Sequence, residues 1–135
     1  MREVEVSAFV PASPAAVERA LTPETVIEYE GSFAVKDVEE TDEGTTVTAG
    51  ATGLTMRLDF EERADGLYYS QRGDEGPFDA METTLSVESE DEGSRVTARS
   101  AVSLGLPVPA VSDRVAAWKR RGELRRALDA LAEDV

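Results

Sequence analysis

The amino-acid sequence predicts an α+β fold: a curved antiparallel sheet of seven strands wrapped around a long C-terminal helix, with two short helices after the first strand. Three observations carry this prediction. Seven segments alternate apolar and polar residues, as strands with one buried face do. Six of these segments are consecutive and are separated by short turns rich in Asp, Glu and Gly. The last segment, from about 109 to 135, has the apolar spacing of a helix.

The first part of the chain predicts one strand and two short helices. Residues 2–10 (REVEVSAFV) alternate between a valine-bearing face and a glutamate-bearing face. Ser13 is a favourable N-cap residue and Pro14 suits the first helical position, so a helix is expected to begin there. Thr22, followed by proline, repeats this signal for a second helix, and Gly31 ends it.

The middle of the chain reads as a meander of strands. The expected strands are 32–41, 45–51, 54–63, 67–73, 78–90 and 94–106. A strongly twisted sheet of this size curls, and one helix alone cannot fill its concave face. The small residues Thr83, Ala98 and Ser100 fall on the inward rows, which favours a cavity between the sheet and the long helix. Its entrance is expected between that helix and the loops around Gly53, 73–77 and 105–109.

The long helix carries apolar residues on two faces. At about 100° per residue, one face holds Val111, Val115, Trp118 and Gly122, and the other centres on Ala117, Leu124, Ala127, Leu128 and Leu131. The apolar stripe is therefore expected to turn near Gly122. A glycine weakens a helix interior by about 1 kcal/mol relative to alanine, so its presence there fits a helix that bends or that leaves room beneath it. A ligand passing beneath the helix there would meet the indole of Trp118.

The length and charge of the chain limit the number of domains and the kinds of partner it can have. A chain of 135 residues predicts a single domain spanning 1–135. Acidic residues number 28 against 14 basic ones, giving a net charge of −14, and only two of the cations are lysines. This pattern favours an acidic surface adapted to high salt, with a basic partner as the alternative. It disfavours nucleic-acid binding, since few cations are available to neutralise phosphates.

Two residue types are missing from the sequence. With no cysteine and no histidine, disulfides, thiolate metal sites, Ser–His–Asp triads and imidazole proton transfer are excluded. No apolar run approaches the roughly 20 residues of a membrane span, and the N-terminal residues lack a signal-peptide core. We therefore expect a cytoplasmic protein without stable membrane insertion, and no catalytic group, metal or cofactor.

The candidate ligand-binding residues form the expected cavity wall. They are Met56, Leu58, Phe60, Tyr69, Met81, Leu85, Val96, Val102, Val115, Trp118 and Gly122. Each one taken singly is also consistent with ordinary core packing. Tyr68 and Tyr69 point to opposite faces of their strand, and Tyr69 shares the parity of Leu67, so we place Tyr69 inward.

Charged residues offer fewer candidates. The carboxylates Asp59, Asp79 and Glu82 are interpreted as solvated groups on strands and not as a catalytic pair. Five cations lie on the long helix: Lys119, Arg120, Arg121, Arg125 and Arg126. They indicate either a basic rim for an anionic head group or a membrane-touching surface. We favour a third interpretation here, in which the cations stabilise the helix C-terminus and offset the neighbouring acidic residues.

Three stretches also carry a family resemblance: VSAFVPASPAAVERALTPE, GPFDAMETTLSVE and VSLGLPVPAVSDRVAAWKRRGELRRALDAL. Over essentially the whole chain, the sequence resembles the SRPBCC superfamily, which includes START domains, polyketide cyclases and birch-pollen allergens. It is most similar to small stand-alone members from salt-loving archaea. The resemblance implies the helix-grip fold. No catalytic residue set is common to this superfamily, so none is transferred.

The function expected from these patterns is the binding, with transport as a further role, of a small hydrophobic molecule such as a lipid, an isoprenoid or quinone, or a polyketide-like ring. Burial of apolar ligand surface would supply the affinity, at about 25 cal/mol per Å². Two alternatives stay open. One is a cyclase or dehydrase that uses Tyr69 or Arg72 for proton transfer in the same cavity. The other is a protein-interaction module without a ligand.

Overall fold

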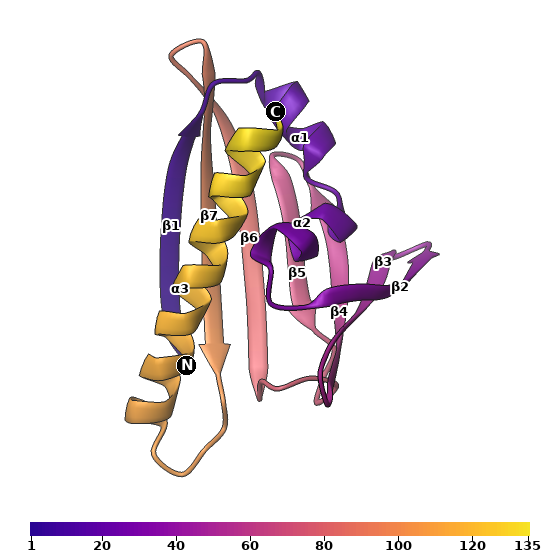
Figure 1. Cartoon of the computed structure of the whole chain (residues 1–135), viewed down its shortest axis with the longest axis vertical. Coiled ribbons are helices and arrows are strands. Elements are labelled where there is room, and N and C mark those ends of the chain that lie inside the picture. Colours follow the sequence, from indigo (N-terminus) through magenta and orange to yellow (C-terminus); the bar gives the residue numbers. More distant parts are fainter.

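The protein has ten helices and strands in the order that the sequence predicts (Figure 1). The computed structural model describes the backbone of residues 1–135 and the side chains of residues 1–108 and 110–135. The elements are β1 (Arg2–Val10), α1 (Pro14–Ala20), α2 (Pro23–Glu30), β2 (Ala34–Thr41), β3 (Gly44–Ala51), β4 (Leu54–Arg63), β5 (Gly66–Gln71), β6 (Ala80–Glu90), β7 (Gly93–Ser103) and α3 (Pro109–Asp134).

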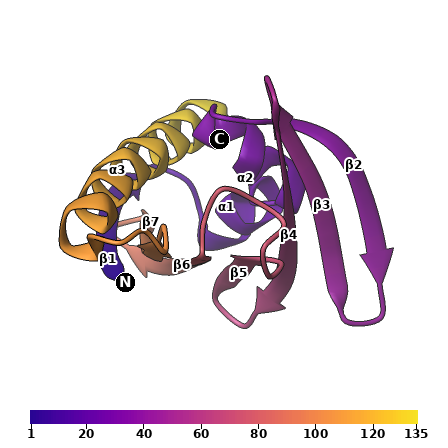
Figure 2. The same cartoon turned by 90° about the horizontal axis from the view of Figure 1, so that it is seen from below.

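All seven strands form one antiparallel sheet, in the order β1-β7-β6-β5-β4-β3-β2. The first strand therefore pairs with the last, and α1 and α2 carry the chain from β1 to the far edge of the sheet at β2. Seen from below, the sheet curls around the helices, with α3 near β1 and β7 (Figure 2). This arrangement confirms the predicted seven-stranded helix-grip architecture.

Local sequence signals fix the ends of the short helices. The Ser13 hydroxyl accepts a hydrogen bond from the N–H of Ala16 at 3.2 Å and caps α1. Thr22 and Thr25 form a reciprocal capping box at the start of α2. Gly31 ends α2 with a φ of 79°, a conformation that glycine adopts without strain.

The largest difference from the expected strand ends is in β7. The alternation predicts a strand as far as residue 106, but β7 ends at Ser103. The N–H of Leu104 donates to the Asp113 carboxylate of α3 at 2.9 Å, and Gly105 turns the chain with a φ of 68°. The alternating pattern therefore continues past the point where the backbone leaves the sheet.

The buried face of α3 is the second of the two apolar faces. Leu124, Leu128 and Leu131 are at most 2% exposed, and they pack in the core against the sheet. Ala116 and Ala117 extend this face toward the start of the helix. These small side chains allow the helix axis to approach the sheet closely. The buried stripe is thus continuous along α3 and does not turn at Gly122, which corrects the expectation from the sequence.

Candidate functional site

A row of paired residues crosses the concave face of the sheet beneath α3. Tyr69 of β5 is paired with Thr83 of β6, and Thr83 is paired with Ser100 of β7. Phe60 of β4 continues the row and stacks on Tyr69 with ring centroids 4.5 Å apart. Because Thr83 and Ser100 are small, the row leaves a hollow between its aromatic end and the helix.

Arg120 of α3 fills this hollow. Its guanidinium lies at the centre of the buried stripe, and the residue is 3% exposed. Nη2 donates to the Tyr69 hydroxyl at 2.5 Å and to the Thr83 hydroxyl at 2.8 Å, while Nε donates to the Ser100 hydroxyl at 3.2 Å. The cavity that the sequence predicts at these small residues is therefore not open, because the Arg120 side chain occupies it.

The counterion of Arg120 comes from the end of α2. Glu30 accepts a hydrogen bond from Arg120 Nη1 at 2.5 Å and another from the Tyr69 hydroxyl. Its backbone carbonyl accepts from Arg126 Nε at 2.9 Å, which ties the end of α2 to α3. Glu123 lies one turn after Arg120, 3.4 Å from Nη1. One guanidinium thus faces two buried carboxyl groups.

Tyr69 and Arg120 both keep their protons at neutral pH. Burial raises the pKa of Tyr69 far above its usual value, and the nearby guanidinium only partly offsets that effect. Burial alone would lower the pKa of Arg120, but the carboxylates of Glu30 and Glu123 raise it above its usual value. Among the described residues, no buried side-chain nitrogen or oxygen lacks a hydrogen-bond partner. The arrangement is that of a saturated structural network.

Eight of the eleven residues predicted to bind ligand lie in the core. Tyr69 belongs to the polar cluster, by which we mean Arg120 and its partners Glu30, Tyr69, Thr83, Ser100 and Glu123. The other seven pack among buried apolar side chains: Met56, Leu58, Phe60, Met81, Leu85, Val96 and Val102. The placement of the other three beneath the helix is wrong. Trp118 is 75% exposed, Val115 is 59% exposed, and Gly122 lies on the same outer face of α3. The side of α3 that faces the sheet is instead the one that carries Ala116, Arg120 and Leu124, which are all buried.

Replacing Gly122 by alanine is therefore expected to stabilise the protein by about 1 kcal/mol, because glycine weakens a helix interior by this amount. A Cβ atom at this position would meet only Arg126 Nη1, 4.0 Å away. Urea unfolding of the variant and the parent measures the difference. A loss of stability would show that the position is packed, as the sequence-based hypothesis of a cavity beneath it requires.

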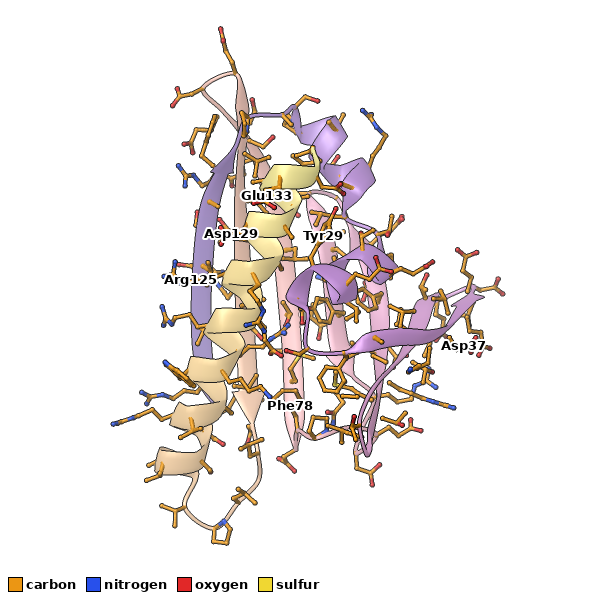
Figure 3. The ribbon with its side chains drawn as sticks, viewed as in Figure 1. Tyr29, Asp37, Phe78, Arg125, Asp129 and Glu133 are labelled. Atoms are coloured by element: carbon orange, nitrogen blue, oxygen red, sulfur yellow. The ribbon has the colours of Figure 1, made fainter. Side chains whose placement is uncertain are left out.

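An apolar pocket lies at one end of the interface between α3 and the sheet. Its volume is about 240 Å³, and Phe78, labelled in Figure 3, is part of its wall. The lining residues are Phe33, Leu54, Pro77, Phe78, Leu104, Val115, Ala116, Lys119 and Glu123. They come from α3, from the connection between α2 and β2, and from positions in or next to the three loops at which the sequence places the entrance. Val115 is the one predicted ligand residue among them.

The pocket combines apolar walls with two charged groups. Lys119 is exposed at the rim, whereas Glu123 is only 5% exposed and also contacts the buried Arg120. Ligand pockets usually measure about 300–1,000 Å³. A pocket of about 240 Å³ therefore has room for a small ring system or the end of a chain, with a polar atom directed at Glu123.

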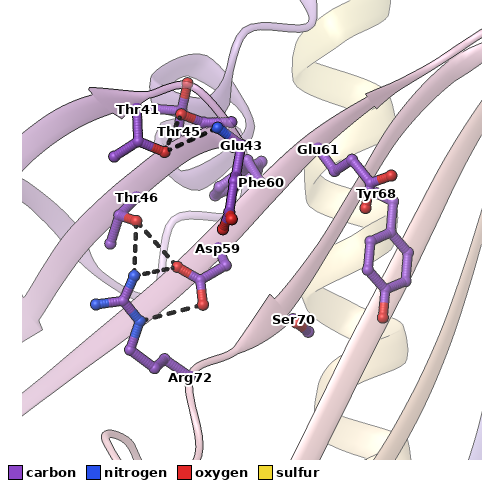
Figure 4. A pocket seen from close by; sticks show the side chains of 11 residues that line it. Thr41, Glu43, Thr45, Thr46, Asp59, Phe60, Glu61, Tyr68, Ser70 and Arg72 are labelled. Atoms are coloured by element: carbon purple, nitrogen blue, oxygen red, sulfur yellow. Dashed lines mark hydrogen bonds and ion pairs between the residues drawn. The ribbon is translucent and has the colours of Figure 1, made fainter.

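A second hollow, of about 210 Å³, lies on the opposite face of the sheet (Figure 4). There Arg72 donates to Asp59 at 2.7 Å and to the Thr46 hydroxyl at 3.0 Å. The hydrogen bond from Arg72 holds the pKa of Asp59 below its usual value. The two charges are paired with each other at the surface. The placement of Arg72 here corrects its proposed role in the inner cavity.

Sequence reasoning missed Glu30, Arg120 and Glu123 as inward-facing groups. Two signals pointed to the arginine. The spacing Ala116, Arg120, Leu124 follows one helical face, and the inward rows of two strands carry hydroxyls at Thr83 and Ser100. Glu30 had no such signal, because it lies 90 residues before Arg120 in the chain.

Solved structures share this fold across nearly the whole chain. A protein from Thermus thermophilus superposes with a TM-score of 0.76 at 22% identity, covering 98% of this chain and 95% of that one. A START superfamily protein from Mycobacterium smegmatis gives 0.74 at 14% identity, with 98% and 97% covered. The di-domain ARO/CYC protein BexL of the BE-7585A biosynthetic pathway gives 0.67 at 22% identity, with 94% of this chain and 45% of that one covered.

No curated protein matches the chain. The family model described as "Polyketide cyclase / dehydrase and lipid transport" matches residues 1–135, which is the whole sequence. The START and SRPBCC resemblance read from the sequence agrees with this match and with the fold. The chain belongs to the polyketide cyclase/dehydrase and lipid transport family.

Proposed function

We propose that the protein binds a small hydrophobic molecule with one polar end in the pocket beside α3. The observation that carries the proposal is the lining of this pocket, which is apolar except for Lys119 at the rim and the buried Glu123. Apolar walls supply affinity through burial, at about 25 cal/mol per Å². A carboxyl group in the wall favours a ligand that donates a hydrogen bond, such as a ring hydroxyl.

The pocket volume narrows the class of ligand. About 240 Å³ is equivalent to roughly eight water-sized groups at about 30 Å³ each. The rings or chain end of a phenol, a quinol or an isoprenoid alcohol fit this space, and the rest of a larger molecule would extend past the rim at Lys119. Family membership supports lipid or polyketide-like chemistry for such a ligand.

Filling the pocket is expected to weaken ligand binding by about tenfold. Ala116 is 8% exposed and lines the pocket, so Ala116→Phe places a ring inside it. The probe is 2-naphthol, whose intrinsic fluorescence reports binding and whose hydroxyl can donate to Glu123. Ala110→Phe, an exposed position on the same helix, is the matched control and is expected to bind like the parent.

A second probe tests the polar end of the pocket. 2-Methoxynaphthalene has the same rings but no donor, and it is expected to bind at least about tenfold more weakly than 2-naphthol, because a hydrogen bond to a charged group contributes about 1.5–3 kcal/mol. Equal affinity of the parent and Ala116→Phe for 2-naphthol would place the binding site elsewhere. Absence of binding by either probe would favour the interaction module without a ligand.

The alternative function is a cyclase or dehydrase reaction in the same pocket. Glu123 is the residue that favours it, because it is an acidic residue in the lining of an apolar pocket that can hold an aromatic ring. Tyr69 is fully buried, and its raised pKa keeps the hydroxyl protonated, so it does not serve as a base. Turnover of a polyketide-like substrate that is lost in Glu123→Gln would establish the enzyme over the binding protein.

The setting of the protein is also a proposal. No described helix has the length and apolar character needed to cross a membrane. We infer a cytoplasmic protein from a high-salt host, because a net charge of −14 with only two lysines fits a surface that stays dispersed in concentrated salt.

A further inference from the structure

The outer surface of α3 leaves large apolar side chains in solvent. Val111, Val115 and Trp118 are 62%, 59% and 75% exposed, and Leu106 and Val108 in the preceding loop are 52% and 59% exposed. Val111, Val115 and Trp118 repeat at intervals of three to four residues, so they share one side of the helix. We call these five residues, with the cations described next, the α3 outer surface.

The charges of this surface have one sign. Every exposed ionisable side chain between residues 104 and 126 is a cation, although the chain as a whole carries −14. These cations are Arg114, Lys119, Arg121, Arg125 and Arg126. Farther along the helix the sign reverses at Asp129 and Glu133, which Figure 3 labels together with Arg125.

Four of these cations differ from most of the arginines in or next to the strands. Arg57, Arg63, Arg72, Arg95 and Arg99 each form an ion pair with a nearby carboxylate. In the described part of the chain, no carboxylate lies within ion-pair distance of Arg114, Lys119, Arg121 or Arg125. Arg2, Arg19 and Lys36 also form no ion pair, but they are scattered over β1, α1 and β2, whereas these four described cations lie together on one surface.

The helix dipole does not account for this arrangement. Cations stabilise a helix near its C-terminus, and anions stabilise it near its N-terminus. The last turn of α3 contains no basic residue and its first turn no acidic one. The interpretation of the cations as C-terminal stabilisers is therefore wrong. Another interaction has to explain why they lie beside exposed apolar side chains.

We propose that the α3 outer surface docks on the surface of an anionic lipid bilayer. A bilayer interface offers negative head groups to Arg114, Arg121 and Arg125 and an apolar layer to the protruding side chains, and it accepts both at once. Tryptophan is favoured at this interface because its indole is amphipathic. The surface is the convex side of a helix with its preceding loop, a shape that suits a broad, deformable partner.

The docking surface is continuous with the mouth of the pocket. Val115 and Lys119 belong to both, and Leu104, which precedes the exposed loop, lines the pocket. If the pocket takes an apolar ligand as proposed, docking would let that ligand pass between bilayer and pocket without crossing water. Docking itself does not depend on that function, and it can be measured with no ligand present.

Trp118 is the sole tryptophan of the chain, so its fluorescence tests the proposal directly. In about 0.1 M salt the Debye length is about 10 Å, which screens the distant acidic residues. Vesicles of phosphatidylcholine with roughly a third phosphatidylglycerol are expected to shift the Trp118 emission to shorter wavelength, and vesicles of phosphatidylcholine alone are not. Raising the salt to about 1 M, where the Debye length is about 3 Å, is expected to reduce the shift by removing the contribution of the cations, while the contribution of the apolar side chains persists in concentrated salt.

Matched charge variants complete the test. Arg121→Gln with Arg125→Gln is expected to weaken vesicle partitioning about 25-fold, because each surface cation contributes a factor of roughly five. Arg2→Gln with Arg19→Gln makes the same change in net charge at exposed positions outside the surface and is expected to leave partitioning unchanged. Circular dichroism checks that each variant is folded.

Three results would overturn the proposal. Equal emission shifts with anionic and zwitterionic vesicles would show that the cations do not contribute to vesicle binding. Equal losses in the two double variants would assign binding to net charge alone. A shift produced by soluble poly-glutamate as strongly as by anionic vesicles would identify an acidic protein as the partner. None of these results bears on the binding of 2-naphthol, so failure of docking and failure of the pocket are separable.

Discussion

Replacing Arg120 by leucine is expected to lower the free energy of unfolding by about 3–5 kcal/mol. The substitution leaves the carboxyl groups of Glu30 and Glu123 buried without their cation, and the Tyr69 hydroxyl loses one of its partners. Domains of this size are stable by about 5–15 kcal/mol in total. The variant should therefore unfold at a much lower urea concentration than the parent, or be only partly folded.

Arg121→Leu is the matched control for this prediction. Arg121 is the next residue along α3 and is exposed, so its replacement is expected to change stability by no more than about 0.5 kcal/mol. Replacing Glu30, Arg120 and Glu123 together by methionine, with Tyr69→Phe, is expected to recover most of the loss, because apolar side chains of similar volume often substitute for a buried ion pair. A loss below about 1 kcal/mol in Arg120→Leu would contradict a buried network.

Raising the pH above 10 is expected to destabilise the protein through Tyr69. Burial raises the pKa of Tyr69 far above its unfolded value of about 10. Above pH 10 the unfolded chain therefore releases this proton while the folded protein keeps it, so stability falls as pH rises, by about 1.4 kcal/mol per pH unit. At pH 12 the loss from this one tyrosine is about 2.7 kcal/mol.

Urea unfolding at several pH values between 10 and 12 measures this slope. Burial also raises the pKa of Tyr29, to about 12, so part of the slope is expected to remain in Tyr69→Phe. Tyr68 lies on the other face of β5, and Tyr68→Phe is the control that should keep most of the slope. Tyrosinate absorbance from all three tyrosines while the fold persists would show that Tyr69 is not buried as described.

The polar cluster and the pocket have different parts in the proposed function. Arg120 joins α3 to the sheet and to the end of α2, and its hydrogen bonds fix the position of Glu123 in the pocket wall. A destabilised cluster should therefore also disturb the pocket. For this reason the binding test uses Ala116, which lines the pocket and is not part of the cluster.

The sequence alone determined the order of elements, the antiparallel sheet and the inward rows of the strands. These features depend on local signals. Alternation over a few residues selects the buried face of a strand, and caps such as Ser13 and Gly31 fix helix ends. The predicted strand residues Leu58, Tyr69 and Val102 are buried for this reason.

Only the tertiary structure decided which face of α3 is buried and what lies beneath it. Both faces carry apolar residues, so periodicity could not choose between Trp118 and Leu124. The choice depends on a charge pair separated by 90 residues: Arg120 can enter the core only because Glu30 is brought to it by the end of α2. A buried guanidinium is stable when paired and hydrogen-bonded, and that pairing is a property of the assembled fold.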